Sequence, residues 1–387
     1  MRSIFASLLA VFLAACLFAV SAAAQDVQPI DTRARNAILV DASTGDVLFQ
    51  KEADTPVPPA SMSKLVTQAV VFDLLKSGDL KDDQKFKISE DAWRRGGSPS
   101  GGSTMYAELN SEVSIIDLLR GAVIQSANDA CIALAEGIAG SETAFLERMK
   151  AKGVKLGLKN STFRNSTGLP DPQHLMSVRD LALVARSIIY DHPDRFALYK
   201  EPAFTWNNIA QNNRNPLLKD YPGADGMKTG YTKEAGYGLV GTAQRDNRRL
   251  ILVVAGFDSA QARKEDAQKL LDWGFGQYKQ VEVFQAKDVV GQARVWGGNE
   301  NWVDLLTLQP FSIALTEDEK KTVEVKLNYK GPLYAPVKQE DQIGLVRIYV
   351  RGRAIAEIPV ITAKEVAASE GMWEKAWDSA LIMMFGG

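Results

Sequence analysis

Ser61 and Lys64 are the residues of this 387-residue chain whose types and spacing most directly suggest chemistry. They stand three residues apart, where the proline-rich stretch 56–59 gives way to an apolar run. On a helix this spacing puts both side chains on one face, a turn apart. A serine becomes a good nucleophile when a neighbouring base takes its proton, and a lysine can be that base if burial and nearby positive charge hold it partly neutral. The pair predicts covalent acyl transfer, although the same spacing also occurs by chance in surface helices.

Two more short motifs follow Ser61 and Lys64 along the chain. They are Ser126-Ala127-Asn128 and Lys228-Thr229-Gly230. The three motifs have the order S-x-x-K, S-x-N and K-T-G, which is typical of the penicillin-interacting serine enzymes. Taken alone, Ser126 or Asn128 could simply cap a helix. Three motifs in this order are far more specific than any one of them.

The elements that must position these motifs follow from the apolar pattern. Residues 61–76 form a helix that is apolar on most sides, which predicts a buried central helix with Ser61 at its N-terminus. The second motif is expected in a turn between a helical segment over 111–124 and a helix that begins near Asp129.

Strands are predicted around the third motif and near the start of the chain. Residues 37–49 predict a β-hairpin, and the apolar runs 238–243 and 249–256 predict another, with Lys228-Thr229-Gly230 on a short strand beside it. The glycine of that motif would let a substrate approach the backbone closely. A helix is expected from about Ala260 to Leu271.

Residues 37–275 resemble the catalytic domain of the D-alanyl-D-alanine carboxypeptidases, the low-molecular-mass penicillin-binding proteins. The likeness rests on the three motifs and on the segments 225–232, 235–237 and 269–275. It implies an α+β fold like that of the serine β-lactamases and penicillin-binding transpeptidases, in which helices flank a five-stranded antiparallel sheet. It also implies a substrate, the peptidoglycan stem peptide that ends in D-Ala-D-Ala, and β-lactams as inhibitors.

The resemblance assigns catalytic roles to three residues. Ser61 would attack the carbonyl of the penultimate D-alanine, Lys64 would accept the serine proton, and Ser126 would relay a proton to the leaving amine. The backbone N–H groups of Ser61 and Tyr231 would stabilise the oxyanion.

Other residues are expected to bind the substrate. Lys228 would add positive field around Lys64, Asn128 would hold the peptide amide, and Thr229 and Arg263 would bind the terminal carboxylate. Tyr231 stands where some family members carry histidine. The predicted substrate-binding set is therefore Asn128, Lys228, Thr229, Gly230, Tyr231 and Arg263.

Composition divides the chain into four parts. Residues 1–24 predict a signal peptide, with Arg2 before an apolar run and alanines at 22–24 as a cleavage site. An alternative is a lipoprotein box that ends at Cys16. Residues 25–278 would form the catalytic domain and 279–366 a small β-sandwich.

Residues 367–387 predict an amphipathic helix. Its apolar stripe consists of Met372, Trp373, Ala376, Trp377, Ala380, Leu381 and Met384. Such a helix suits a membrane interface, or it could dock on the protein's own surface. The expected location is the periplasmic face of the bacterial inner membrane, as a peripheral protein.

Other functional classes are less compatible with the sequence. A net charge of −2 argues against nucleic acid, and two histidines without a Cys/His cluster argue against zinc, so no cofactor is expected. Cys131 is expected in the core and His174 as a structural hydrogen-bonding residue. A serine β-lactamase would need a glutamate in an E-x-x-L-N pattern between the second and third motifs, which is absent. Endopeptidase action on cross-links and a non-catalytic spacer are the remaining alternatives.

Overall fold

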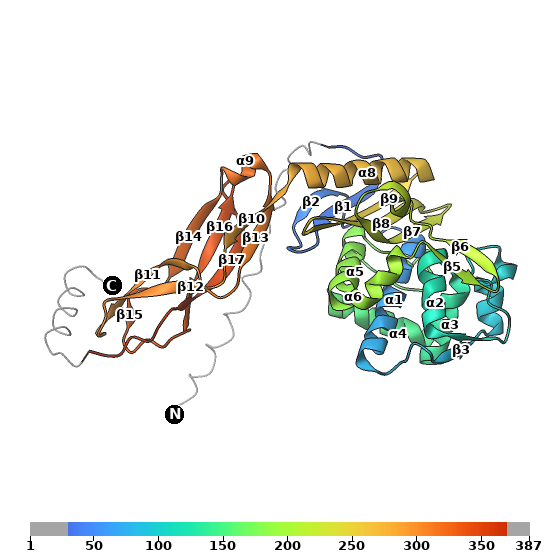
Figure 1. Cartoon of the computed structure of the whole chain (residues 1–387), viewed down its shortest axis with the longest axis horizontal. Helices are drawn as coiled ribbons and strands as arrows, with labels where there is room; N and C mark the ends of the chain where they lie inside the picture. The colour runs from blue at the N-terminus through green and yellow to red at the C-terminus, as the bar shows by residue number, and fades with distance from the viewer. Residues whose placement is uncertain (1–29, 370–387) are drawn as a thin grey trace, which may run out of the picture. The chain divides into compact units, whose positions relative to one another are not determined.

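The computed structural model describes residues 30–369 of the chain (Figure 1). The predicted signal peptide lies outside these residues. So does the predicted C-terminal helix, apart from its first three residues. Within residues 30–369, no helix combines the length and the apolarity needed to cross a bilayer.

A five-stranded sheet with the order β2-β1-β9-β8-β7 lies at the centre of the N-terminal region, and every neighbouring pair is antiparallel. Figure 1 shows α8 on one side of this sheet and α1 and α5 on the other. Because both faces are covered, eight consecutive residues of β9 are buried. The predicted flanked sheet and both predicted hairpins are confirmed. The bounds are β1 Asn36–Asp41, β2 Val47–Lys51, β7 Ala224–Thr232, β8 Gly236–Arg245 and β9 Arg248–Phe257.

The predicted central helix is confirmed as α1, which runs Lys64–Ser77 and follows a 3-10 turn, η1, at Ala60–Ser63. Every α1 residue from Lys64 to Phe72 is buried. Helices α2 to α5 bury apolar residues in the same core as α1, and Phe196 of α6 packs against it, whereas α7 and α8 contribute no residue to this core. The bounds of these helices are α2 Ile115–Arg120, α3 Asn128–Ala139, α4 Glu142–Leu156, α5 Val178–Asp191, α6 Pro193–Phe196, α7 Leu217–Asp220 and α8 Ala260–Gln277.

Short turns and strand pairs complete this region. The turns are η2 Ala92–Gly96, η3 Ser98–Ser100, η4 Gly121–Gln125 and η5 Ala197–Lys200, and the paired strands are β3 Lys85–Lys87 with β4 Glu112–Ser114 and β5 Ala203–Trp206 with β6 Ile209–Asn212.

The prediction of a continuous helix over 111–124 is wrong. Val113 pairs with Phe86 in the short ladder of β4 and β3, so the segment begins as a strand. The hydroxyl of Ser114 then accepts a hydrogen bond from the backbone of Asp117 and caps α2, which ends after six residues in the π turn η4. The interruption is tertiary in origin, because the pairing strand lies about 27 residues earlier in the chain.

Helix α8 is longer than the sequence predicted, since it continues to Gln277 and includes Trp273. Gly274 explains the continuation, because a Cβ there would lie 2.6 Å from Leu39 and 2.9 Å from Leu250. The missing side chain lets the last turns of the helix lie against the sheet.

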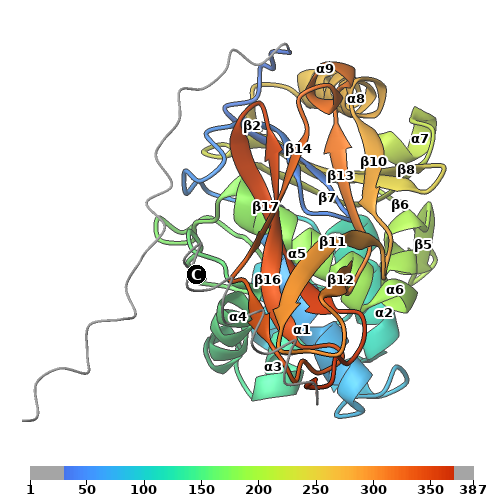
Figure 2. The same cartoon turned by 90° about the vertical axis from the view of Figure 1, so that its left-hand side faces the viewer.

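Apart from the short helix α9, the regular structure of residues 279–362 is all strand, and Figure 2 turns these strands toward the viewer. One sheet has the order β14-β16-β17-β12-β11-β15, and β10 pairs with β13. Alternate residues such as Val303 and Leu305 form an apolar core. The bounds are β10 Lys279–Phe284, β11 Val289–Trp296, β12 Trp302–Thr307, β13 Phe311–Leu315, α9 Glu317–Lys320, β14 Glu324–Tyr329, β15 Leu333–Tyr334, β16 Gln342–Val350 and β17 Arg353–Thr362.

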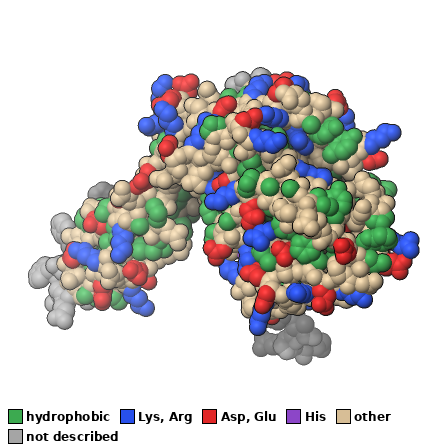
Figure 3. All heavy atoms as spheres, turned by 45° about the vertical axis from the view of Figure 1, so that its right-hand side comes forward, with side chains coloured by type: hydrophobic (Ala, Val, Ile, Leu, Met, Phe, Trp, Pro, Cys, Tyr) green, Lys and Arg blue, Asp and Glu red, His purple; other side chains and the backbone are tan. Residues whose placement is uncertain are grey.

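Basic and acidic side chains are interspersed over the face of the molecule shown in Figure 3. This mixture agrees with the small net charge of the whole chain, −2.

Candidate active site

Ser61 and Lys64 meet at the junction of η1 and α1. The Lys64 amine donates a hydrogen bond of 2.9 Å to the Ser61 hydroxyl oxygen. Ala60 holds a positive φ of 48°, and its carbonyl lies so close to Gly168 that a Cβ there would be only 1.9 Å away. A glycine at 168 is thus required for the turn that presents Ser61.

The Lys64 amine has two further partners, and both are carbonyl oxygens. It donates 2.7 Å to the side-chain oxygen of Asn128 and also donates to the backbone carbonyl of Thr167. Lys64 is fully buried, and this burial lowers its pKa to about 8, with Arg214 as the cation that lowers it further. A neutral amine would use its two hydrogens on these two oxygens and leave its lone pair facing Ser61.

Ser126 follows the π turn η4 in a left-handed conformation, with φ 65°. Its hydroxyl is buried and has no hydrogen-bond partner within residues 30–369. Asn128 is held beside it because its backbone donates 2.7 Å to the carbonyl of Ser103. Next to it, the Asp129 carboxylate accepts hydrogen bonds from Thr104 and Met105 and ties the motif to the loop before α2.

Lys228, Thr229 and Gly230 lie on β7, where the sheet passes η1. Lys228 is fully buried, and burial holds its pKa well below the usual value, with Lys64 as the next cause. Its amine donates 3.1 Å to the carbonyl of Thr229. A Cβ on Gly230 would lie 2.9 Å from the carbonyl oxygen of Pro59, so glycine brings this strand directly against the serine turn.

These elements enclose a pocket of about 250 Å³. Its lining residues are Ser61, Ser103, Ser126, Arg214, Thr229, Gly230, Tyr231, Tyr237 and Arg263. Six of them were predicted from the sequence. The other three predicted residues, Lys64, Asn128 and Lys228, are buried and do not line the pocket, but Lys64 contacts Ser61, Asn128 contacts Lys64, and Lys228 adjoins Thr229.

Sequence reasoning missed Arg214, Ser103 and Tyr237. Arg214 donates 2.6 Å to the Ser103 hydroxyl and 3.2 Å to the side-chain oxygen of Gln125, which are both neutral partners. Burial lowers its pKa, so this cation is held at a site that disfavours its charge. No local motif marks Arg214 in the sequence. Tyr237 did fall in the segment 235–237 that resembles the carboxypeptidases.

An aromatic stack forms one wall of the pocket. The rings of Tyr231 and Tyr237 lie 4.2 Å apart at 30°, and the Arg263 guanidinium lies 5.7 Å from the centre of the Tyr237 ring. Arg263 donates 3.3 Å to the carbonyl of Gly238, while its Nε is buried without a partner in the described chain. A residue on α8 therefore reaches the pocket beneath two tyrosines of the sheet.

Two other predictions about single residues are confirmed. The ring of His174 is buried, and its Nδ1 accepts a hydrogen bond of 3.1 Å from the backbone of Arg164. Burial lowers the pKa of His174 to about 4, so the ring is neutral near pH 7. Cys131 is fully buried, and burial raises the pKa of its thiol to about 11. Neither side chain lines the pocket.

Comparison with protein families finds two matches, one after the other along the chain. Residues 21–259 match the family model described as D-alanyl-D-alanine carboxypeptidase. Residues 278–368 match the model described as the C-terminal domain of penicillin-binding protein 5.

Individual relatives agree with these matches. The chain is 36% identical over 365 residues to the D-alanyl-D-alanine carboxypeptidase DacC of Escherichia coli, which covers 93% of this chain and 91% of that one. The crystal structure of penicillin-binding protein 5 from Haemophilus influenzae is similar with a TM-score of 0.80 and 35% identity, over 88% of this chain and all of that one.

A structure with a bound β-lactam is also similar. It is penicillin-binding protein D2 from Listeria monocytogenes in an ampicillin-bound form, with a TM-score of 0.56 and 29% identity, over 64% of this chain and 98% of that one.

Proposed function

Since this chain belongs to the D-alanyl-D-alanine carboxypeptidase family of serine peptidases, we propose that it removes the terminal D-alanine of peptidoglycan stem peptides through an acyl-enzyme at Ser61. The observation that carries the proposal is the bond of 2.9 Å between the Lys64 amine and the Ser61 hydroxyl, at a lysine that is fully buried. A buried lysine with a pKa of about 8 is partly neutral near pH 7 and can act as a base.

In the acylation step, the Ser61 oxygen attacks the carbonyl carbon of the penultimate D-alanine while its proton passes to Lys64. The backbone N–H groups of Ser61 and Tyr231 donate to the oxyanion, and losing one such donor typically costs about 3 kcal/mol of transition-state stabilisation. The Ser126 hydroxyl gives its proton to the leaving amine and is reprotonated from Lys64. The Ser126 hydroxyl lies on the pocket wall and has no hydrogen-bond partner within residues 30–369, which leaves it available for this relay.

In the second step, water attacks the acyl carbon and Lys64 again accepts the proton, so that the shortened peptide leaves with a free carboxylate and Ser61 regains its hydrogen. Dividing amide hydrolysis in this way replaces one difficult step with two easier ones.

The cations at the pocket suit a substrate that ends in a carboxylate. Arg214 and Arg263 both line the pocket, and neither has a carboxylate partner among residues 30–369. A planar guanidinium matches a carboxylate in shape as well as in charge. Thr229 adds a hydroxyl at the same wall. We assign the terminal carboxylate of the substrate to Arg263 and Thr229.

Incubation with a labelled penicillin, followed by peptide mapping and a separate assay of D-alanine release, tests the proposal. We expect the label on the peptide that contains Ser61, and we expect Ser61→Ala to lose both labelling and D-alanine release while it stays folded. Ser98→Ala, a change at an exposed serine of the loop before the second motif, should keep both. A label on any other serine would overturn the assignment of the nucleophile.

Export and membrane attachment are part of the same proposal. We infer that the chain is exported, that its domains divide at 25–278 and 279–366, and that residues 367–387 lie as a helix in the bilayer interface, with the tryptophans of the stripe against the lipid. Deleting everything after Ala368 should release the protein from vesicles and leave its activity on a soluble peptide unchanged. Equal partitioning of the two forms would refute the membrane helix.

A further inference from the structure

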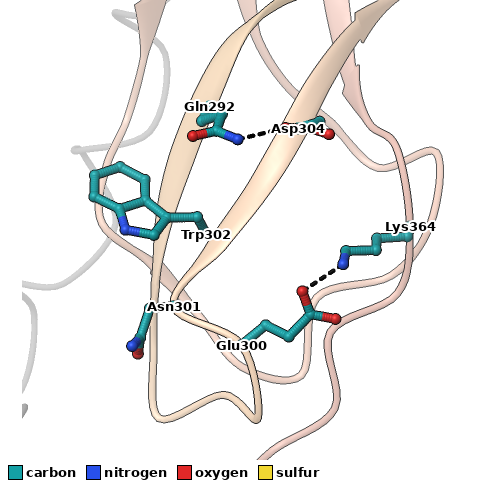
Figure 4. A pocket seen from close by; sticks show the side chains of 6 residues that line it. All are labelled: Gln292, Glu300, Asn301, Trp302, Asp304 and Lys364. Atoms are coloured by element: carbon teal, nitrogen blue, oxygen red, sulfur yellow. Dashed lines mark hydrogen bonds and ion pairs between the residues drawn. The ribbon is translucent and has the colours of Figure 1, made fainter.

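The strand-rich region contains an open hollow of about 390 Å³, beside the hairpin of β11 and β12. Figure 4 shows the six side chains that line it. They are Gln292, Glu300, Asn301, Trp302, Asp304 and Lys364. All six are polar or aromatic, and the volume falls within the range of small-molecule sites in proteins.

Four of the polar side chains of the hollow form two pairs. Gln292 and Asp304 are direct partners across the two strands, and the Gln292 amide donates 2.7 Å to the Asp304 carboxylate. Lys364 forms an ion pair with Glu300. Figure 4 shows these two pairs with the indole of Trp302 on the far side of the group from Lys364. The cross-strand pair orients the Gln292 and Asp304 side chains, which reduces the ordering entropy lost on binding.

Aromatic side chains gather on the same outer face of the hairpin. Trp302 is 48% exposed, and its ring is backed by the guanidinium of Arg294 at 5.9 Å. Trp296 lies two residues after Arg294 on the same strand, so the two side chains point to the same face. The ring of Trp296 meets that of Tyr334 edge-on, with the ring centres 6.1 Å apart, and Tyr334 is 67% exposed. The intervening residues of both strands face the apolar core, so core packing does not account for these aromatic rings.

Unpaired polar atoms also occur on this face. The Nε of Arg294 and the Nε1 of Trp296 are buried without hydrogen-bond partners within residues 30–369. Buried donors are rarely left unsatisfied in a stable protein. Neither residue is among the six that line the hollow, so buried water, and not a ligand in the hollow, is the acceptor that suits these two donors.

The charges of the hollow restrict the ligand. Two carboxylates, Glu300 and Asp304, and one amine, Lys364, give a net charge of −1, which disfavours nucleic acid and anionic lipid. Each carboxylate already has a side-chain partner, and two carboxylates are too few for a calcium site. The polar lining also differs from the apolar centre of a protein–protein interface. Among the ligand classes considered, the lining therefore favours a neutral ligand that is rich in hydroxyl and amide groups and has an apolar face for the indole.

We propose that this hollow binds a neutral saccharide chain of N-acetylated amino sugars, the class of polymer that carries the stem peptides. The choice of this polymer rests on the proposed function. Ring C–H groups of the sugar lie on Trp302, while hydroxyl and N-acetyl groups bond to Gln292, Asp304 and Asn301. Holding the glycan raises the effective concentration of its attached peptides at the catalytic pocket.

Titration of the full-length protein with a tetrasaccharide of β-1,4-linked N-acetylglucosamine, followed by calorimetry, tests the site. We expect saturable binding with a Kd of about 1 mM or tighter. Trp302→Ala should weaken it at least about tenfold, because an aromatic anchor supplies much of the affinity at such sites. Gln292→Ala, a change at an exposed residue, is a second variant that should also weaken it. Tyr190→Ala is the matched control, since Tyr190 is exposed to the same extent, 49%, on α5.

Two further measurements separate this site from the catalytic one. Trp302→Ala should release D-alanine from a soluble peptide at the normal rate, and Ser61→Ala should bind the tetrasaccharide as tightly as the unaltered protein. Absence of saturation by the unaltered protein up to about 10 mM would overturn the saccharide site. Equal Kd values for the unaltered protein and a folded Trp302→Ala variant would overturn it as well. Loss of binding to anionic vesicles in Trp302→Ala, without any tetrasaccharide binding by the unaltered protein, would assign the face to lipid instead.

Discussion

The rate of acylation should depend on pH through Lys64, because only the neutral amine can take the Ser61 proton. With a pKa of about 8 for Lys64, the neutral fraction is about 1% at pH 6, about 10% at pH 7 and about half at pH 8. The second-order rate constant for acylation by a fluorescent penicillin should therefore rise about tenfold per pH unit below pH 7 and level off above about pH 9. His174 does not interfere, since its pKa is about 4.

Substitution of Arg214 tests this pH dependence, because the positive charge of Arg214 lowers the pKa of Lys64. Arg214→Gln removes that charge, so the pKa of Lys64 should rise and the midpoint of the profile should move to higher pH. Arg214→Lys keeps a cation and should leave the midpoint near its original value. The height of either profile can fall for other reasons, since Arg214 lines the pocket, so the midpoint is the quantity to compare.

Two outcomes would refute this reasoning. A profile that stays flat between pH 6 and pH 8 would remove Lys64 as the titrating base. An unchanged midpoint in Arg214→Gln would show that Arg214 does not tune it. Because Lys64 also lowers the pKa of Lys228, the measured midpoint belongs to the coupled pair of amines.

Three more substitutions test the site and its support. Lys64→Arg should be inactive in the penicillin and D-alanine assays, because a guanidinium stays charged and cannot act as a base; near-normal turnover would exclude Lys64 from that role. Gly230→Ala should slow acylation and lower the free energy of unfolding by about 1–3 kcal/mol, because the new Cβ would crowd the carbonyl of Pro59. Gly276→Ala is the control and should not lower the free energy of unfolding, because no atom lies within 4 Å of the position of its Cβ. Tyr199→Phe should lower the free energy of unfolding, measured with denaturant, by about 1–3 kcal/mol, because the buried Tyr199 hydroxyl donates a hydrogen bond of 2.5 Å to the side-chain oxygen of Gln68. Tyr190→Phe, at an exposed ring, is the control. Equal stability of Tyr199→Phe and the unaltered protein would contradict the argument.

Several parts of this protein were predictable because their signals are local. The spacing of Ser61 and Lys64 is a property of one helical turn, and the structure places the two side chains in contact. The hairpin of β1 and β2 and that of β8 and β9 follow from apolar runs on either side of turn residues. A serine before a helix is another local signal, and the Ser177 hydroxyl caps α5 by accepting a hydrogen bond from the backbone of Asp180.

Other features depended on segments that are far apart in the sequence. Nothing near Arg214 marks it as part of the site, and its place beside Ser103 and Gln125 is set by loops that the fold brings together. The break in the predicted helix over 111–124 likewise comes from the pairing of β4 with β3. Periodicity reports which face of a segment is apolar, but it does not report which partner covers that face.

Lys64 shows most clearly the difference between what local sequence predicts and what the tertiary structure decides. The sequence alone determined that a serine and a lysine share one face of a helix and that two further motifs accompany them. It could not determine the protonation state of the amine, because the pKa depends on burial from every side and on a cation 150 residues away along the chain. Desolvation and charge are properties of three-dimensional surroundings, so only the tertiary structure decided that this lysine can serve as a base.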